Sequence, residues 1–556
     1  MKSSSDHWKK LAANFLAESA EFRLGALPTE SRHPLTMQLS DLCQKDLRKA
    51  IDCFRQVDLL ALEAVKNVIP GVLKLHEDIF HTLEEGHQVF VSGCGATGRL
   101  AISLESIWRE QCLLQRKSLS PTTHPWQERV FGFIAGGDFA LVKSIENFED
   151  HPEYGVRQLQ DLGFTKNDLL IAVTEGGETP FVIGTAEYAA ELSLRSPHFI
   201  FCNPPELLKK TTERSHKILE NPKVRSLFIN TGPMALSGST RLQATTTQQL
   251  AVGAALLACL HSDKLSESKV FCEQLIEEFL QIYQKTDFNG LEKLIVHEAS
   301  IYQRGEYCVH QTSDFGITVL TDTTERTPTF SLLPFESNLD SDPQHSWTYL
   351  SVKDTHSSEG AWKKVLHRGP RSLAWANMKD LYGESKTLGY DFSAQCLERR
   401  QNQIGANKLH SFEIEKTSVR SGQPASSHIG FLRFSIAGQD WQTNLPGHLL
   451  HQHLLTKCAL NITCTLVMGR LHRFYGNVMV YVRPTNKKLV DRSIRYIQLL
   501  LQEKAISTFS YEDICYALFQ EFSMAAQNVP IVLRTLEHLV GKSKLAENGG
   551  VNARGS

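Results

Sequence analysis

A glycine-rich turn between a strand-like run and a helix-like run constrains this chain more than any other feature. Residues 89–100 read VFVSGCGATGRL, and a helical pattern continues after Gly98. Glycine lets the backbone approach an anion closely, Thr97 adds a hydroxyl donor, and the N-terminal end of a helix attracts negative charge. The turn therefore predicts an α/β domain that binds a phosphorylated small molecule. The candidate contacts are Gly95, Ala96, Thr97 and Gly98.

Two familiar phosphate motifs do not fit this turn. No Gly-Lys-Ser/Thr follows it, as a nucleoside triphosphate site requires, and no acidic residue ends a strand about 20 residues further on, as a dinucleotide site requires. A sugar phosphate or a similar ligand remains. The alternative is a plain strand-to-helix turn whose glycines serve packing alone, and the turn by itself leaves both interpretations open.

The charge balance argues against polyanionic partners. The chain has 556 residues, 41% hydrophobic and 22% charged, an ordinary composition for a globular protein. This length allows roughly two to four domains. Lys and Arg number 59 and Asp and Glu 61, which gives a formal net charge of −2. Because no overall basic field exists, we expect neither nucleic acid nor a membrane as a partner.

No segment has the pattern of a membrane span or a secretion signal. The apolar run at 251–260 is far shorter than the ~20 residues that a span needs, and residues 1–6 are polar. The 12 cysteines include no Cys-x-x-Cys pair. We expect a cytosolic protein without disulfides, metal site or cofactor. Cysteines in apolar surroundings, typical of buried thiols, are Cys43, Cys53, Cys202, Cys259 and Cys458.

Strand-like and helix-like patterns alternate through the first half of the chain. Apolar residues at helical spacing fill 59–83, and five β-like runs follow. This order predicts an α/β layered domain with a mostly parallel sheet. Ligands of such sheets bind at the carboxyl ends of the strands, where the turn at 92–98 and a second turn at 174–179 both fall. The β-like runs are 87–92, 130–135, 168–174, 198–202 and 226–230.

A second strand-helix series predicts a second, similar domain. An amphipathic helix at about 267–284 connects the two series, and a helix at 449–471 ends the second. The polar segment 383–427 is expected to hold long loops, and 487–541 reads as helices that cap the domains. The strand-like runs of this series are 306–310, 347–352, 371–376 and 428–434. The predicted units are an N-terminal helical segment (1–58), two α/β domains (59–265 and 266–500), a helical cap (501–542) and a disordered tail (543–556).

Seven short motifs follow one another between Thr29 and Leu242, and together they are far more specific than one glycine turn. They are TESRHP (29–34), the turn at 93–100, IAGG (134–137), ED (149–150), TPFVI (179–183), TGP (231–233) and SGSTRL (237–242). In this order they resemble the sugar isomerase (SIS) domain family, in the branch that contains N-acetylmuramic acid 6-phosphate etherase and the animal glucokinase regulatory protein.

Two segments of the second half resemble the same family. VLTDTTERTPTF at 319–330 resembles the etherase segment that carries a catalytic glutamate, whose place Glu325 takes. GNVMVYVRPTNKKLVDR at 476–492 resembles the closing motif of the family, with Lys488 and Arg492 at its basic positions. The resemblance implies two tandem SIS domains, which are flavodoxin-like, parallel-sheet, three-layer α/β units, with a helical C-terminal cap.

The two domains have each lost a different part of the family's site. In the first, the glycine turn and Glu149 remain, but Ile107 stands where the etherase has a glutamate, and Glu105 lies on a different helix face. In the second, Glu325 remains, but the turn reads QTSDF and has no glycine. The resemblance implies one composite site per chain, built from both domains, to which Lys488 also belongs.

Glu149 and Glu325 match the two carboxylates that act as acid and base in the etherase. One removes a proton beside the lactyl carboxylate and the other protonates the departing ether oxygen, which requires two different pKa values. Without the resemblance, Glu149 reads as part of a solvated helix face and Glu325 as part of a polar loop. Lys488 then reads as a cation at a helix start, where the dipole disfavours it unless an anion lies nearby.

The second turn departs from the family pattern. It reads TEGGETP from Thr174 onward, where relatives carry serine-rich phosphate contacts. Thr174, Thr179 and the backbone of Gly176 can still donate hydrogen bonds, so we keep them as candidate ligand contacts. Glu175 and Glu178 repel a phosphate unless they turn away. Glu175 therefore joins the candidates as a group that meets a sugar hydroxyl or an amine, as Glu178 also could.

Two functions from different classes remain. The first is a regulatory protein that senses a hexose phosphate between its two SIS domains and controls a partner, a sugar kinase being the candidate that the resemblance implies. The alternative is a carbon–oxygen lyase, an etherase on N-acetylmuramic acid 6-phosphate that uses Glu149 and Glu325. An isomerase and a DNA-binding regulator are less favoured, because no synthase-type motif and no basic helix-turn-helix segment occur. We expect a monomer, since one chain already holds a dimer-like pair of domains.

Overall fold

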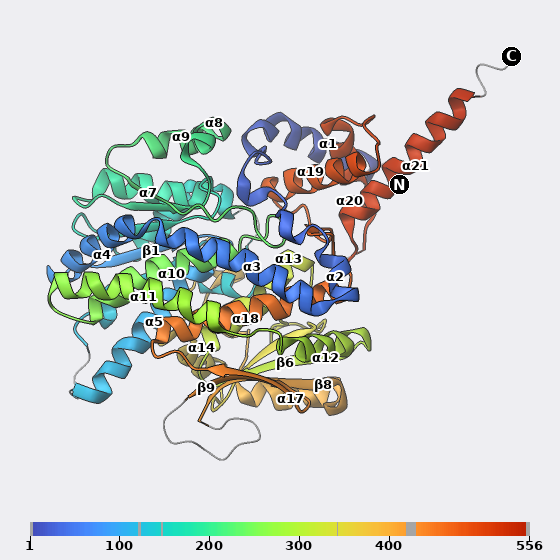
Figure 1. The fold of residues 1–556 in the computed structure, drawn as a ribbon. Helices are drawn as coiled ribbons and strands as arrows, with labels where there is room; N and C mark the ends of the chain where they lie inside the picture. Colours follow the sequence, from blue (N-terminus) through green and yellow to red (C-terminus); the bar gives the residue numbers. More distant parts are fainter. Residues whose placement is uncertain are drawn as a thin grey trace.

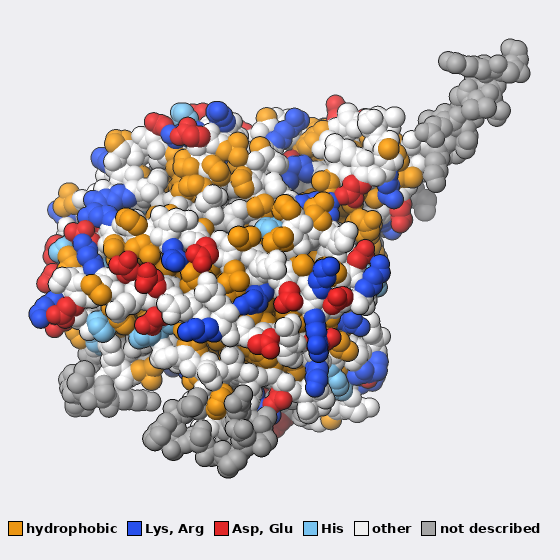
Figure 2. All heavy atoms as spheres, viewed as in Figure 1, with side chains coloured by type: hydrophobic (Ala, Val, Ile, Leu, Met, Phe, Trp, Pro, Cys, Tyr) orange, Lys and Arg blue, Asp and Glu red, His pale blue; other side chains and the backbone are white. Residues whose placement is uncertain are grey.

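Two α/β units and a helical cluster make up the molecule (Figure 1). The computed structural model describes residues 4–119, 124–145, 148–341, 343–418, 430–526 and 528–551. The N-terminal helix lies in the helical cluster, whereas the last helix begins there and projects away from the body of the molecule. Acidic and basic side chains are interspersed over the face in Figure 2, as the near-neutral charge balance predicts. Among the residues covered, no helix is long and apolar enough to span a membrane.

The first sheet has five parallel strands in the order β2-β1-β3-β4-β5. Val89 pairs with Val130 on one side and Leu169 on the other, which sets the register of the central strand β1. Since β2 and β3 add to opposite sides of β1, their carboxyl ends form a switch point where ligands of such sheets bind. All five predicted strands are confirmed, as β1 (Val89–Gly93), β2 (Val130–Ile134), β3 (Leu169–Val173), β4 (His198–Phe201) and β5 (Arg225–Phe228).

Helices cover both faces of this sheet, because alternate residues of each buried strand point to opposite faces. Val89 and Val91 of β1 enter one hydrophobic core and Phe90 enters the other. The first core continues into the second unit and the cap; in the first unit its helices include α3 (Leu47–Lys66), α4 (Ile69–Glu84), α5 (Gly95–Leu119), α10 (Gln243–Leu257) and α11 (Leu265–Lys285). Helices of the second core are α6 (Pro152–Asp161), α7 (Pro180–Leu192), α8 (Pro205–Thr211) and α9 (Glu213–Glu220). The predicted amphipathic helix at 267–284 is confirmed as α11.

The second sheet is mixed, in the order β10-β9-β8-β6-β7. β6 runs parallel to β7 and β8, whereas β9 and β10 are antiparallel additions. Ala437 (φ 47°) and Gly438 (φ 78°) form the two-residue turn between β9 and β10. Such a turn returns the chain antiparallel, which explains why this sheet is not wholly parallel. The strands are β6 (Tyr307–Thr312), β7 (Thr348–Val352), β8 (Leu409–Thr417), β9 (Phe431–Ile436) and β10 (Gln439–Asn444).

Two sequence predictions for the second unit are wrong. Residues 371–376 form no strand, because Leu373 and Trp375 pack into a core of the first unit instead of a sheet. Segment 383–427 holds regular structure as well as loops, namely α16 (Glu384–Leu388), α17 (Ala394–Ile404) and β8. β8 is rich in polar residues because alternate side chains reach the surface. Residues 419–429 lie outside the described part.

The remaining helices connect the units and build the cap. The predicted helix at 449–471 is confirmed as α18 (Leu449–Arg470), which packs against α12 (Leu291–Gln303) and α13 (Gly316–Phe330). The cap contains α1 (Ser4–Glu18), α19 (Lys487–Glu503), α20 (Tyr511–Met524) and α21 (Ile531–Val551). α21 overlaps the predicted disordered tail as far as Val551, and 552–556 lie outside the described residues. Shorter elements are α2 (Leu39–Lys45), α14 (Ser358–Leu366), α15 (Lys379–Tyr382), β11 (Phe474–Tyr475) and β12 (Val478–Met479).

Candidate functional site

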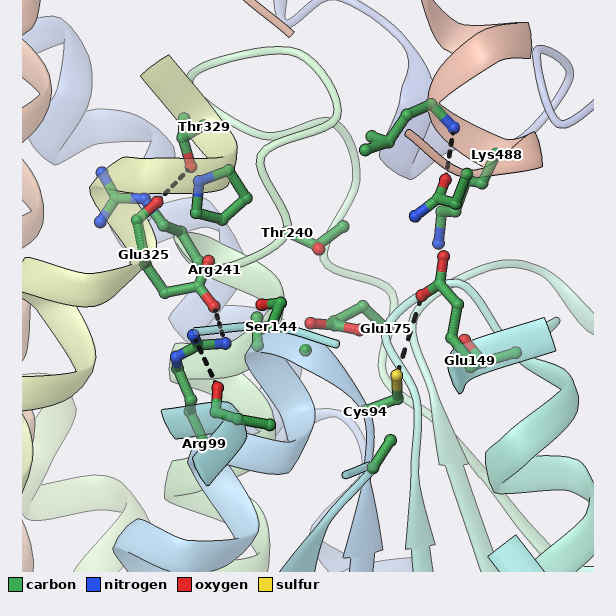
Figure 3. A pocket seen from close by; sticks show the side chains of 18 of the residues that line it. Cys94, Arg99, Ser144, Glu149, Glu175, Thr240, Arg241, Glu325, Thr329 and Lys488 are labelled. Atoms are coloured by element: carbon green, nitrogen blue, oxygen red, sulfur yellow. Dashed lines mark hydrogen bonds and ion pairs between the residues drawn. The ribbon is translucent and has the colours of Figure 1, made fainter. Parts of the chain in front are cut away.

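A cavity of about 220 Å³ lies where the two α/β units meet the cap (Figure 3). Its walls come from the start of α5, the short helical turn 148–150, the second turn 174–179, the loop 238–241, α13 and the start of α19. Residues predicted as site residues that line it are Gly95, Ala96, Glu149, Glu175, Thr179, Glu325 and Lys488. The lining does not include Thr97, Gly98, Thr174 or Gly176.

The glycine turn contributes less to the cavity than its sequence predicts. The Thr97 hydroxyl accepts a hydrogen bond from the Cys94 N–H (3.1 Å) and donates to the Cys94 carbonyl (3.0 Å), so it shapes the turn itself. A Cβ on Gly98 would lie 2.3 Å from the Ile134 side chain, so this glycine serves packing. Gly95 has φ +54°, and a Cβ there would meet nothing within 4 Å. Only Gly95 and Ala96 present the helix N-terminus to the cavity.

Gly93→Ala is expected to lower the free energy of unfolding by about 1–3 kcal/mol, because overpacking forces the backbone to move. The new Cβ would lie 2.3 Å from the backbone carbonyl of Thr97, which cannot rotate away as a side chain can. Urea unfolding followed by circular dichroism measures the effect. Gly447→Ala is the control, since a Cβ there meets nothing within 4 Å. Equal stability of the two variants would contradict the packing role of Gly93.

The second turn keeps its shape through the residues that do not face the cavity. The Thr174 hydroxyl accepts a hydrogen bond from the Gly177 N–H (3.2 Å) and bonds the Thr179 hydroxyl (3.2 Å). The Gly176 carbonyl accepts from the Asn203 side-chain amide (2.9 Å). These bonds hold the turn so that Glu175 and Thr179 line the cavity.

The two acidic residues of this turn differ in their surroundings. Glu178 turns toward Lys488, whose ammonium donates to the Glu178 carboxylate at 2.6 Å. Glu175 lines the cavity, is 6% exposed, and its Oε1 atom has no hydrogen-bond partner among the described residues. Burial raises the pKa of Glu175 to about 7, although the charge of Lys488 works in the opposite direction. This carboxyl is therefore close to half-protonated at neutral pH.

Lys488 has a carboxylate partner within the protein. It lies in the first turn of α19, beside the cap residue Asn486. Burial disfavours its charge, but Glu178, Glu149 and Glu30 outweigh burial and raise the pKa of Lys488. The anion that stabilises a cation at this helix start is thus Glu178, which the sequence pattern did not pair with it.

Glu149 and Glu325 face the same cavity from different units (Figure 3). Burial raises the pKa of Glu149, and its carboxylate accepts a weak hydrogen bond from the Cys94 thiol at 3.8 Å. Glu325, on α13, forms an ion pair with Arg99 of α5 at 2.7 Å. This ion pair joins the two units at the cavity wall, and Arg99 also donates to the Ala140 and Leu141 carbonyls of its own unit.

Several lining residues were not predicted from the sequence, and three of them are deeply buried polar residues. Arg99, Ser239 and Arg241 line the cavity, and each is at most 5% exposed. The Ser239 hydroxyl and the Nε atom of Arg241 have no hydrogen-bond partner among the described residues. The signal in the sequence is their place in two of the family motifs, VFVSGCGATGRL for Arg99 and SGSTRL for Ser239 and Arg241.

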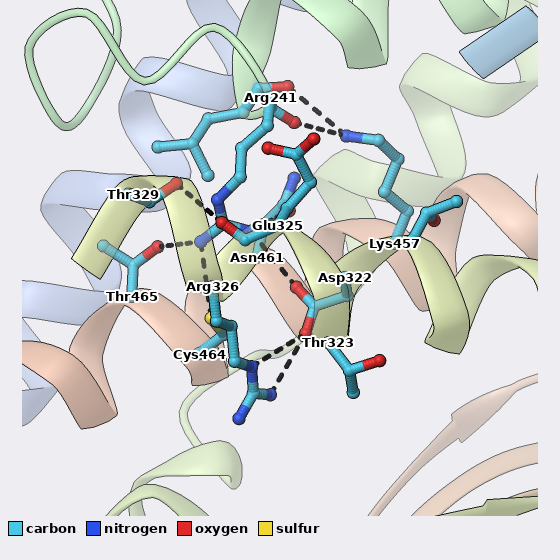
Figure 4. Close-up of polar contacts among 12 residues, drawn as sticks. Arg241, Asp322, Thr323, Glu325, Arg326, Thr329, Lys457, Asn461, Cys464 and Thr465 are labelled. Atoms are coloured by element: carbon cyan, nitrogen blue, oxygen red, sulfur yellow. Dashed lines mark hydrogen bonds and ion pairs between the residues drawn. The ribbon is translucent and has the colours of Figure 1, made fainter. Parts of the chain in front are cut away.

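A buried polar network supports the loop that carries Arg241 (Figure 4). Arg241 pairs with Asp322 at 3.2 Å, and Asp322 also pairs with Arg326 at 3.0 Å. The Lys457 ammonium donates to the Arg241 carbonyl at 2.9 Å and to the Thr246 hydroxyl at 2.8 Å. Burial lowers the pKa of Lys457 to about 8. These contacts hold the Arg241 guanidinium at the cavity wall.

In each unit, the positions at which the family's site has been lost now have structural roles. Ile107 is 1% exposed in the core. Glu105 bonds three arginines, which are Arg109, Arg368 and Arg371. In the second unit, the Thr312 hydroxyl accepts the N–H groups of residues 314 and 315 at the start of α13. That helix start is therefore occupied by the chain's own side chain.

Comparisons with known proteins agree with the resemblance seen in the motifs. The family described as "Glucokinase regulatory protein N-terminal SIS domain" matches residues 71–190. N-acetylmuramic acid 6-phosphate etherase of Enterobacter sp. (strain 638) is 35% identical over 227 residues, which cover 41% of this chain and 68% of the relative. The protein of the same name from Yersinia pestis (strain Pestoides F) is 33% identical over 227 residues, with the same shares of 41% and 68%.

The similarity to solved structures is weaker. A candidate phosphosugar isomerase of Clostridium difficile 630 superposes with a TM-score of 0.39 and 8% identity, over 75% of this chain and 94% of that chain. The description of the fold therefore rests on the two sheets and their strand orders.

Proposed function

Because this chain belongs to the SIS-domain family, in the branch of the N-acetylmuramic acid 6-phosphate etherases and the glucokinase regulatory protein, we propose that it is a sugar-phosphate-binding regulatory protein. The cavity between its two α/β units would hold a hexose phosphate. One observation carries this proposal: the cavity that holds Glu149 and Glu325 is walled by both units and by the first turn of α19.

A ligand enclosed in this way can act as a signal. It would contact α5, α13 and α19 at once, so its binding would favour the arrangement in which these three elements are close. The cap helices α20 and α21 pack against α19 and would transmit a change at the cavity to the surface. We propose a sugar kinase as the partner class, on the strength of the family branch.

The alternative is a carbon–oxygen lyase, and one observation favours it. Glu149 has a raised pKa, whereas Glu325 is paired with Arg99. Two carboxyl groups in different surroundings suit an acid and a base. The relatives at 33–35% identity bear the name of an etherase, which supports the same alternative.

One experiment separates the two functions. The purified chain is incubated with N-acetylmuramic acid 6-phosphate, and D-lactate release is measured against the Glu149→Gln, Glu325→Gln double variant. We expect no lactate above this blank. We also expect a hexose phosphate to raise the melting temperature, since a ligand at 100 times its Kd stabilises a protein by about 2.7 kcal/mol.

The other outcomes are equally informative. Lactate above the blank would establish the lyase with one site per chain. If neither lactate nor any melting shift with hexose phosphates were seen, sugar-phosphate binding at this cavity would be refuted. Asp150→Asn controls for the loss of a carboxylate outside the cavity, because Asp150 neighbours Glu149 but does not line the cavity.

A further inference from the structure

We propose that the cavity selects a hexose phosphate with a free ammonium group, held by Glu175, and that the phosphate lies at Ser239 and Arg241. This inference rests on the proposed function and narrows its ligand class. It reverses the orientation that the glycine turn predicts, in which the phosphate lies at Gly95.

The first argument is the isolation of the Glu175 carboxylate. It is buried, it lines the cavity and it forms no ion pair; it takes a hydrogen bond from its own backbone N–H, but its Oε1 atom has no hydrogen-bond partner among the described residues. Figure 3 shows it projecting into the space between Glu149 and Arg241. A buried carboxylate without a partner is costly, and a ligand that donates to it would remove that cost.

The second argument is the local balance of charge. Every cation that lines the cavity already forms an ion pair with a carboxylate. Glu149 and Glu175 are the lining carboxylates that form no such pair with a described residue, although the charge of Lys488 acts on both. The four existing pairs are Arg99–Glu325, Arg241–Asp322, Lys488–Glu178 and Arg492–Glu30. A phosphate dianion beside Gly95 would meet two carboxyl groups that have no ion-pair partner, whereas an ammonium there would be attracted.

The titration of Glu175 agrees with this geometry. Burial raises its pKa to about 7. Lys488 on α19 and a hydrogen bond from the Glu175 backbone lower the pKa, whereas Glu325 on α13 and Glu178 in the same turn raise it. An ammonium in contact would favour the ionised carboxylate. A neutral hydroxyl or acetamido group brings no charge and has a weaker effect of this kind.

The third argument is a pair of unused donors in the same cavity. The Ser239 hydroxyl and the Arg241 Nε–H are buried, at 4% and 5% exposure, and have no acceptor among the residues described. Figure 3 shows Arg241 with Arg99 on one side of the cavity, and Glu149 with Cys94 on the other. A phosphate oxygen is the acceptor that such donors bind well. The cavity thus offers donors for an anion and an acceptor for a cation.

The test compares three ligands that share the sugar phosphate and differ at one group. Glucosamine 6-phosphate, N-acetylglucosamine 6-phosphate and glucose 6-phosphate are titrated into the full chain at pH 7 by calorimetry. We expect the amine to bind at least about ten times more tightly than the other two, because a hydrogen bond between charged groups is the strong kind. Glu175→Gln should abolish this preference.

Glu187→Gln is the matched control. Burial raises the pKa of Glu187 too, but this residue does not line the cavity, so its variant should keep the preference. If the wild-type chain bound the three ligands equally, the inference would be wrong and the proposed function would stand. If it bound none of them, both would fall. A preference that survived Glu175→Gln would overturn the assignment to Glu175.

A second measurement covers the case in which Glu175→Gln does not fold. Calorimetry of the wild-type chain in buffers of different ionisation enthalpy counts the protons released on binding. Near pH 7 the amine should release more protons than glucose 6-phosphate, because it selects the ionised form of a half-protonated carboxyl group. Equal proton release by the two ligands would overturn the inference.

Discussion

Replacing Glu105 by glutamine is expected to lower the free energy of unfolding by about 3–5 kcal/mol, the usual cost of breaking a buried ion pair. Glu105 is 1% exposed on α5 and contacts Arg109 at 3.0 Å, Arg368 at 3.0 Å and Arg371 at 2.7 Å. The last two lie in the second unit, so this carboxylate joins the two α/β units. Glutamine keeps its shape and removes its charge.

The stability that Glu105→Gln loses should depend on pH. Burial by itself raises the pKa of Glu105, but Arg368, Arg371 and Arg109 outweigh it and lower the pKa from 4.5 to about 2. A depressed pKa means that the stabilisation is present above the ordinary value and is lost as pH falls from 4.5 toward 2. The difference between wild type and Glu105→Gln should therefore shrink over this range.

Urea unfolding at pH 7 measures the effect, and Glu128→Gln is the control. Glu128 bonds the same Arg109, but its side chain is 65% exposed. An exposed pair contributes about 0–1 kcal/mol, so the control should lose little stability. If Glu105→Gln lost no more than Glu128→Gln, the role of Glu105 as a bridge between the units would be refuted.

Arg326→Met is expected to have an effect of similar size, about 3–5 kcal/mol. The Arg326 side chain is fully buried and pairs with Glu298 at 2.8 Å. It also pairs with Asp322 at 3.0 Å (Figure 4). The methionine would leave two buried carboxylates with less compensation. Because Asp322 also holds Arg241, we expect weaker binding of a hexose phosphate to the variant as well.

Two comparisons test this expectation. Arg304→Met removes an arginine from an exposed pair with Glu306, at 48% and 21% exposure, and should cost under about 1 kcal/mol. Adding Glu298→Gln to Arg326→Met removes one of the stranded charges and should restore part of the stability. Strictly additive losses in the double variant would show that the charge of Glu298 is not what makes Arg326 necessary.

The order of strands and helices in the first unit could be predicted because its signals are local. Five short apolar runs separated by helical patterns specify a parallel sheet with buried strands, whatever the rest of the chain does. In the second unit, β8 and β10 carry many polar residues, and Leu373 and Trp375 imitate a strand while packing on the other unit. Whether these segments form strands depends on contacts between the units, so the periodicity within each segment gave the wrong prediction.

Some residues of the candidate site could likewise be predicted from the sequence, and others could not. Motif order alone pointed to Glu149 and Glu325, and the structure brings both to one cavity. Residue type also predicted ligand contacts for Thr97 and Thr174, but their hydroxyl groups bond neighbouring backbone groups and do not reach the cavity. A threonine hydroxyl has the same chemistry in both situations, and only its surroundings determine what it binds.

The sequence by itself determined the two α/β units, the family and the pair of carboxylates, because strand patterns and motifs are properties of short segments. Only the tertiary structure decided which charges compensate one another. It pairs Lys488 with Glu178, pairs Arg99 with Glu325, and leaves Glu175 without an ion-pair partner among the residues described. The two residues of each pair lie far apart in the chain. Whether a buried charge is paired depends on distances of a few ångströms that the fold alone sets.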